Sequence, residues 1–121
     1  MIEPHELGKM GEDLAAQHLV NKGYQILERN WHSGHKEIDL VALDGTTLVV
    51  VEVKTRRSDD YGEPDIAVGK SKQRMLVWAA DSYVRYKKLN VDVRFDIVSI
   101  VFNDDTPEIE HIEDAFIASL Y

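Results

Sequence analysis

The stretch EIDLVALDGTTLVVVEVK, residues 37–54, decides the fold. Apolar residues dominate both halves, and the Asp44-Gly45 pair between them is a strong short-range signal for a hairpin turn. The pattern predicts two antiparallel strands, Glu37–Leu43 and Thr46–Lys54, joined at that pair. Charged residues nevertheless gather near the open end of this hairpin, where alternating valine and leucine would make a better core.

The turn also predicts which side chains meet. With the Asp-Gly pair as the two loop residues, Glu37 lies opposite Glu52 and Asp39 lies opposite Val50. Side chains alternate between the two faces of a sheet, so these carboxylates share one face with Lys54. Opposite Cβ atoms are about 5 Å apart and diagonal ones about 7–8 Å, which brings Asp39 and Glu52 within reach of one bound cation.

Two interpretations of this acidic face are open. Carboxylates crowded together repel one another, and a hard divalent ion such as Mg²⁺, which takes oxygen ligands, would compensate that repulsion. The alternative is an exposed face whose carboxylates point into water, since antiparallel sheets often have one solvated side. The hairpin alone does not choose between a metal site and a solvated face.

The first helix bears on this choice. It is predicted over His5–Lys22, with Gly23 at its C-terminal end. Glu12 falls on a strip of small and apolar residues that includes Gly8 and Ala16. We therefore expect Glu12 to point toward the sheet, with Gly8 and Ala16 allowing a close approach. A glutamate favoured by the helix dipole is the alternative explanation.

The rest of the chain alternates between strands and helices. Together with the elements above, the hydrophobic periodicity predicts the order α-β-β-β-α-β-β. This order indicates an α/β domain with a mixed sheet flanked by helices. The remaining predicted elements are the strands Tyr24–Asn30, Val91–Phe102 and Glu108–Ile112 and a second helix over Lys70–Lys88.

The net charge of −8 argues against a nucleic-acid partner when taken alone, because phosphate binding depends on lysine and arginine. From Lys54 to Lys88, however, nine basic residues outnumber five acidic ones, so this segment carries +4 and the remainder −12. The distribution is compatible with one phosphate-facing surface, and also with mixed charges on a solvated helix.

Other features of the composition predict a single cytoplasmic domain over residues 1–121. The length suffices for one core without covalent staples, and the absence of cysteine excludes disulfides and thiolate zinc sites. The opening MIEPHELG lacks the layout of a signal peptide. No apolar run approaches the roughly 18 residues that a membrane helix needs, so no membrane partner is expected.

Short motifs occur in a particular order: Gly11-Glu12, Glu37-x-Asp39-Leu40, Glu52-x-Lys54, Lys72-Gln73 and Arg94-Phe95-Asp96. In this combination the chain resembles the YraN-like proteins, small bacterial proteins assigned to the PD-(D/E)xK nuclease superfamily and related to archaeal Holliday junction resolvases. The resemblance extends from Gly8 to Phe116. Its specific part is the ordered combination, because the ExK element alone is common. The chain departs from the family at Lys36, where the family usually has glycine.

The resemblance implies a restriction-endonuclease-like three-layer fold and a role for each motif. Asp39 and Glu52 would bind a catalytic Mg²⁺ or Mn²⁺, with the carbonyl of Val53 as a further ligand and Glu12 completing or extending the site. Lys54 would orient the attacking water or stabilise the developing phosphorane charge. The residues expected to contact nucleic acid are Lys72, Gln73, Arg56 and Arg57, and Glu37 is expected just outside the metal ligands.

These features predict an Mg²⁺-dependent endonuclease that hydrolyses phosphodiester bonds in nucleic acid, with DNA, branched or otherwise processed, as the expected substrate. One alternative is a nucleic-acid-binding protein of the same fold without useful catalysis. Another is a protein-interaction domain whose acidic face is incidental. A homodimer is expected only by analogy with the resolvases.

Three aromatic residues could stack on bases: Trp31, Tyr61 and Trp78. Trp78 falls inside the second helix beside its apolar stripe, and is therefore predicted to belong to the core.

Overall fold

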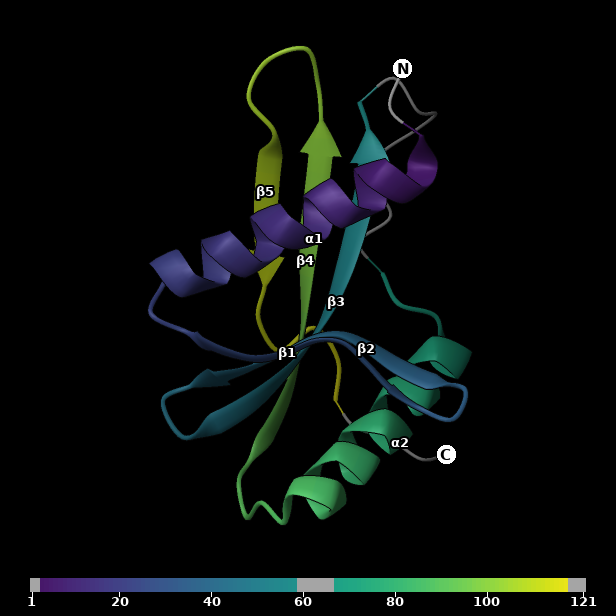
Figure 1. Cartoon of the computed structure of the whole chain (residues 1–121), viewed down its shortest axis with the longest axis vertical. Coiled ribbons are helices and arrows are strands. Elements are labelled where there is room, and N and C mark those ends of the chain that lie inside the picture. The colour runs from purple at the N-terminus through teal and green to yellow at the C-terminus, as the bar shows by residue number, and fades with distance from the viewer. Residues whose placement is uncertain (1–2, 59–66, 118–121) are drawn as a thin grey trace.

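The computed structural model describes residues 3–58 and 67–117, and Figure 1 shows its ribbon. The predicted order of elements is confirmed. The elements are α1 (Pro4–Asn21), β1 (Gln25–Ser33), β2 (Lys36–Asp44), β3 (Thr47–Arg57), α2 (Lys70–Lys87), β4 (Val93–Phe102) and β5 (Glu108–Ile112).

The five strands form one mixed sheet in the order β1-β2-β3-β4-β5. Strands β3 and β4 are parallel, whereas the other neighbouring pairs are antiparallel. Parallel neighbours require a crossover connection, and α2 lies in the segment between β3 and β4. In Figure 1, β3, β4 and β5 run along the long axis of the molecule, and the β1–β2 hairpin crosses them at a steep angle.

Two cores lie on opposite faces of this sheet. Val49 and Val51 of β3 pack with Leu19 of α1, whereas Val50 between them packs with Leu76 of α2. Because successive strand residues point to opposite faces, α1 and α2 must cover different sides of the sheet. The result is the expected arrangement of a mixed sheet flanked by helices.

The turn between β2 and β3 differs from the prediction. Asp44 pairs with Thr47, so the two loop residues are Gly45 and Thr46 rather than Asp44 and Gly45. Gly45 has φ +61°, and a turn of type II′ takes glycine at its first central position. Every cross-strand pairing is thereby displaced by two residue numbers. An even displacement keeps the same side chains on the same face, but it removes the predicted pairing of Glu37 with Glu52.

The helices end close to the predicted positions. Gly23 has φ +95° and follows α1, as expected for a C-terminal glycine. No helix among residues 3–58 and 67–117 combines the length and the apolar character needed to cross a membrane.

The predicted placement of Trp78 in the core is wrong. Its surface is 51% exposed, because the buried stripe of α2 lies on a different side of the helix. Trp31 instead packs edge-to-face on Tyr83, with ring centroids 5.2 Å apart. Tyr61 lies outside the described residues.

Candidate functional site

The candidate site lies where β2 parts from β3. Pairing between these strands ends at Leu40 and Val51, while β2 continues to pair with β1. Asp39 is the first residue of β2 beyond this fork, and its Oδ2 accepts a hydrogen bond from the backbone N–H of Val53 at 2.8 Å. Within a strand, the N–H and C=O of one residue point to the same side, so the Val53 carbonyl also faces the fork.

Asp39 and Glu52 are neighbouring carboxyl groups at this fork. Burial, followed by the neighbouring Asp39 carboxylate, raises the pKa of Glu52 to about 7 against the lowering effect of Lys72. The Glu52 side chain is only 13% exposed, and its Oε2 lies 3.5 Å from Lys72 Nζ. Two carboxylates so close together repel each other, and a divalent cation bound between them would compensate that repulsion.

Glu12 approaches Asp39 from α1. Its Oε1 accepts a hydrogen bond from Asn30 Nδ2 at 2.7 Å and lies 3.7 Å from Arg29 Nη2. Burial and the charge of Asp39 raise the pKa of Glu12, and Arg29 and Asn30 oppose that rise. The expectation that Glu12 points toward the sheet is confirmed.

A glycine brings α1 this close to β3, but it is Gly11 rather than Gly8. A Cβ atom at Gly11 would lie 2.1 Å from Thr55 Oγ1, a distance that no real Cβ atom tolerates. A Cβ atom at Gly8 would meet nothing within 4 Å. The absence of a side chain at Gly11 therefore sets the height of Glu12 above the sheet.

The lysine and glutamine of the sequence motifs hold the segment that precedes α2. Lys54 Nζ donates a hydrogen bond to the carbonyl of Ala67, and Gln73 Nε2 donates one to the carbonyl of Val68 at 2.7 Å. Together with the Lys72–Glu52 ion pair, these contacts bring the start of α2 to the fork. The structure thus joins the ExK and KQ motifs, which are 18 residues apart between Lys54 and Lys72.

Glu37 does not take the predicted position opposite Glu52. It pairs with His32 of β1, and its Oε2 lies 3.1 Å from His32 Nε2. The prediction is wrong for two reasons: the observed turn displaces the register by two residue numbers, and β2 and β3 part before Glu37.

The sequence prediction missed two residues of β1 that contact the site. Arg29 donates a hydrogen bond to Asp13 and lies beside Glu12, and Asn30 holds Glu12 as described above. Asn30 has φ +52°, in the left-handed region that asparagine tolerates better than most residues. The only signal in the sequence was an asparagine at the predicted end of a strand, which is too common to identify a site.

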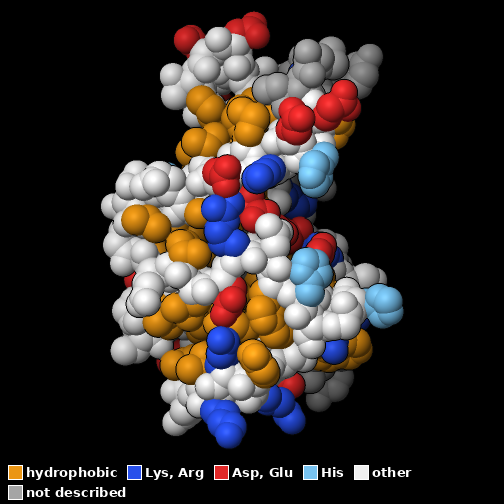
Figure 2. All heavy atoms as spheres, viewed as in Figure 1, with side chains coloured by type: hydrophobic (Ala, Val, Ile, Leu, Met, Phe, Trp, Pro, Cys, Tyr) orange, Lys and Arg blue, Asp and Glu red, His pale blue; other side chains and the backbone are white. Residues whose placement is uncertain are grey.

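A recess of about 670 Å³ opens between α1 and the fork. Glu12 and Asp39 lie in its wall, with Lys9 and Arg29 beside them. Figure 2 shows acidic and basic side chains, with histidines nearby, gathered where α1 meets the β1–β2 hairpin. The recess is therefore a polar one with both signs of charge.

The oxygen donors of the site suit a hard cation. In the part of the chain that the structure describes, no three carboxylate or imidazole side chains gather closely enough to enclose a metal ion. The fork instead offers two carboxylates, Asp39 and Glu52, beside the carbonyl side of Val53, with Glu12 beyond Asp39. This donor set fits Mg²⁺, which is usually held by one or two carboxylates and keeps several waters.

Fold and site together define an α/β domain with a mixed five-stranded sheet between two helices and an acidic pair at the fork of its second and third strands. The model of the Uncharacterised protein family UPF0102 matches residues 11–100, and the chain belongs to this family. This confirms the resemblance to the YraN-like proteins.

Relatives match over almost the whole length. A UPF0102 protein of Phocaeicola vulgatus is 46% identical over 116 residues, which cover 96% of each chain. One of Flavobacterium johnsoniae is 48% identical over 120 residues, covering 96% of this chain and 98% of the relative. One of Bacteroides thetaiotaomicron is 42% identical over the full 121 residues of both chains.

Proposed function

We propose that this protein is an Mg²⁺- or Mn²⁺-dependent endonuclease that hydrolyses phosphodiester bonds in nucleic acid, with DNA as the expected substrate. The observation that carries the proposal is the carboxyl pair of Asp39 and Glu52 at the fork, held near Lys72 and joined through β3 to Lys54. Two partly buried carboxylates that repel each other destabilise the fold. A divalent cation bound by both would remove that repulsion, which gives the pair a reason to exist.

Each residue at the fork would have a separate role in hydrolysis. Asp39, Glu52 and the Val53 carbonyl would hold Mg²⁺, which supplies charge that polarises the scissile phosphate and makes water more acidic. Lys54 would orient the attacking water and stabilise the charge that develops on the phosphate oxygens. The attacking water loses one proton to solvent as its oxygen bonds to phosphorus, the ester P–O bond breaks in line with the new bond, and the departing oxygen takes up a proton from solvent.

The remaining basic residues would bind phosphate groups away from the reacting one. Lys72 lies at the fork on α2, where its ammonium group already meets a carboxylate. Arg56 and Arg57 are the last residues of β3, on the far side of Lys54 from the fork. Such contacts position nucleic acid and carry no sequence information.

One observation favours the second candidate, binding without cleavage. The ammonium group of Lys54 donates one of its three N–H groups to the Ala67 carbonyl, which ties this lysine to the segment before α2. A protein in which Lys54 serves only to hold this segment would bind nucleic acid and leave it intact.

The test is cleavage of labelled single-stranded, branched and duplex DNA and RNA with Mg²⁺, Mn²⁺ or EDTA. We expect metal-dependent cutting that falls by about 100-fold or more in Asp39→Asn and Lys54→Ala, in the range seen when one catalytic electrostatic group is lost. Binding should survive in Lys54→Ala. The matched control is Asp81→Asn, an exposed carboxylate on α2 that pairs with Arg85, which should cut like the wild type.

The outcomes separate the candidates. Binding with no cutting under any metal condition would support the second candidate and contradict the nuclease. If the protein binds no nucleic acid at moderate salt, both candidates are contradicted and the protein-interaction domain is favoured.

A further inference from the structure

A second recess adjoins the one at the fork. It has a volume of about 240 Å³, and the two share Pro4 and Gly8 of α1 and Thr55 of β3 as lining residues. Together they form one groove between the N-terminal half of α1 and β3, which we call the α1 groove. It runs from Asp39 at the fork to Arg57 at the end of β3.

The length of the α1 groove follows from its lining. Val53, Thr55 and Arg57 are alternate residues of β3 that line it in turn. Strand residues rise by about 3.3 Å each, so this wall is about 13 Å long. That is room for a short run of nucleotides beside a phosphate held at the fork.

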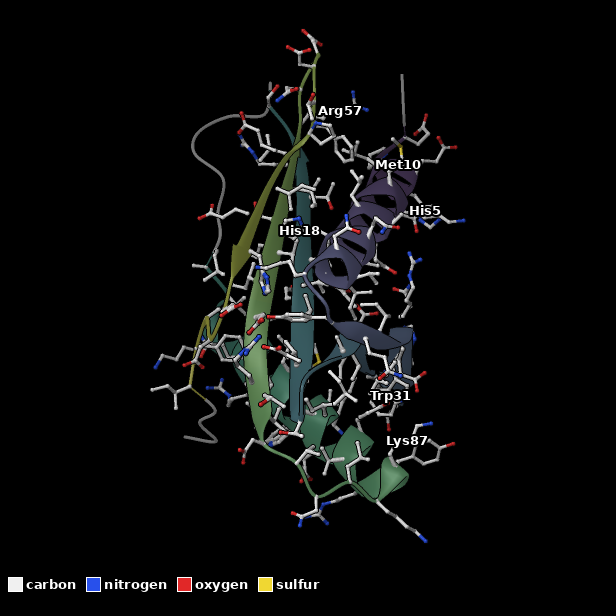
Figure 3. The ribbon with its side chains drawn as sticks, turned by 90° about the vertical axis from the view of Figure 1, so that its left-hand side faces the viewer. His5, Met10, His18, Trp31, Arg57 and Lys87 are labelled. Carbon is white, nitrogen blue, oxygen red and sulfur yellow. The ribbon has the colours of Figure 1, made fainter. Side chains whose placement is uncertain are left out.

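Positive charge lies at the end of the α1 groove away from the carboxylates. Arg56 and Arg57 line the smaller recess, next to the first turn of α1. Figure 3 shows Arg57 at the upper end of the sheet, in the part of the molecule where α1 carries Met10. The N–H groups of a helix N-terminus also favour an anion, and Glu3 provides no side-chain cap there.

One atom in this region lacks an acceptor. Arg56 Nε is buried and has no hydrogen-bond partner among residues 3–58 and 67–117. A buried donor without a partner is costly, and a phosphate oxygen is a strong acceptor for a guanidinium group. The site of this unpaired donor is therefore suited to a phosphate group.

Side chains that can stack on bases line the larger recess. His5 and Arg29 lie in its wall, and the flat groups of histidine and arginine both stack on unpaired bases. A double helix carries its phosphates on a convex surface and keeps its bases inside, so it cannot place a nucleotide in a recess between a helix and a strand. An unpaired strand can.

From these features we infer that the α1 groove binds an unpaired strand, with the bases at His5 and Arg29 and a phosphate at Arg56 and Arg57. The inference rests on the proposed function, because that function places the reacting phosphate at Asp39. It narrows the substrate class to nucleic acids with unpaired nucleotides beside the cleaved bond, as in single strands, flaps and branch points, over continuous duplex.

Gly8 offers a sharp test. It lines both recesses, and a Cβ atom there would meet nothing within 4 Å, so a side chain can begin at this position without a clash and extend into the α1 groove. Leucine is also a better helix former than glycine. Gly8→Leu should therefore keep or raise the melting temperature while it blocks the groove. Gln17→Leu adds the same side chain to an exposed position of the same helix and is the matched control.

The measurement is fluorescence anisotropy with a labelled oligothymidine strand and a blunt duplex of the same length, each in EDTA and in Mg²⁺. We expect the wild type and Gln17→Leu to bind the strand about tenfold more tightly than the duplex. Gly8→Leu should have about tenfold lower affinity for the strand and an unchanged affinity for the duplex. Arg57→Gln should lower the slope of log affinity against log salt by about 0.7, the loss of one phosphate contact. Equal affinity for strand and duplex, or unchanged strand binding by folded Gly8→Leu, would overturn the inference.

Failure of the α1 groove and failure of the proposed nuclease give different results. Preferential strand binding that Gly8→Leu abolishes, without cutting under any metal condition, supports the groove and contradicts the nuclease. Metal-dependent cutting that is as fast on continuous duplex as on unpaired strands contradicts the groove and supports the nuclease.

Discussion

The ionised carboxylate of Glu52 lowers the stability of the fold, although the proposed function needs that carboxylate to bind a metal ion. Its carboxyl group is buried beside Asp39, so ionising both groups together is unfavourable in the metal-free protein. The pKa of Glu52 is about 7 in the folded chain, against an ordinary value of 4.5. The folded state therefore binds more protons than the unfolded state between these two values. Linkage then requires stability to fall as pH rises from about 4.5 to about 7, with the loss complete above that range.

Glu52→Gln should consequently stabilise the metal-free protein at pH 8 and have little effect at pH 4.5. The difference between the two pKa values corresponds to at most about 3 kcal/mol, and glutamine can still donate a hydrogen bond to Asp39. Urea unfolding in EDTA at both pH values measures this change. Adding Mg²⁺ at pH 8 should stabilise the wild type but not the variant. An equal effect of the substitution at both pH values would contradict the assigned pKa.

At the scale of elements, the contact between α1 and β3 controls the site. Gly11 lies directly against Thr55, and the next residue of the helix is Glu12. Any group that separates the two elements moves the Glu12 carboxylate away from Asp39. The helix also covers the α1 groove, so its distance from the sheet sets the width of that groove.

Gly11→Ala should destabilise the protein by about 1–3 kcal/mol, the usual cost of overpacking a close contact. Thr55→Ala removes the two nearest atoms, so the double variant should recover part of that loss. Gly8→Ala is the matched control, because it makes the same change in the same helix into open space, and should stabilise by about 0.5–1 kcal/mol. Thermal or urea unfolding checks all four proteins. Equal effects of the two glycine substitutions would show that the Thr55 contact is unimportant.

At the scale of the whole molecule, one buried network joins elements that are distant in the chain. Asp96 of β4 accepts two hydrogen bonds from Arg94, at 2.9 and 3.0 Å, and one from His111 of β5 at 2.7 Å. Arg94 also bonds Asp44 at the β2–β3 turn and the hydroxyl of Tyr24, which follows α1. The Arg94-Phe95-Asp96 motif thus holds the sheet together away from the fork.

Asp96→Ala should destabilise the protein by about 3–5 kcal/mol, because it leaves the Arg94 guanidinium partly buried without its main partner. Burial raises the pKa of Asp96, but the hydrogen bonds from His111 and Arg94 outweigh burial and hold it below 3.8. The stabilisation is therefore present above pH 3.8 and is lost as pH falls through the folded pKa. Urea unfolding at pH 7 checks the first statement, with Asp81→Ala as an exposed control that should change stability by less than about 0.5 kcal/mol. If Asp96→Ala lowers the free energy of unfolding no more than Asp81→Ala does, the structural role of Asp96 is contradicted.

The sequence by itself determined the elements and the proximity of Asp39 to Glu52 near the open end of the hairpin. The signals used were local ones: the hydrophobic periodicity, Gly23 and the Asp44-Gly45 turn. A small error in the position of one signal leaves the predicted elements unchanged. The misplaced turn shifted the register by an even number, which leaves the faces of the paired residues unchanged, and Asp39 still lies beside Glu52.

Only the tertiary structure decided which carboxylates form the site and which residues support them. The parting of β2 from β3 left Glu37 with His32, and the turning of the β1–β2 hairpin brought Asn30 to Glu12. Likewise, the seating of α2 on the sheet exposed Trp78. The physical reason is that burial and the distances between charges depend on how whole elements pack against one another. The residue pattern of one element carries no information about where the neighbouring element ends.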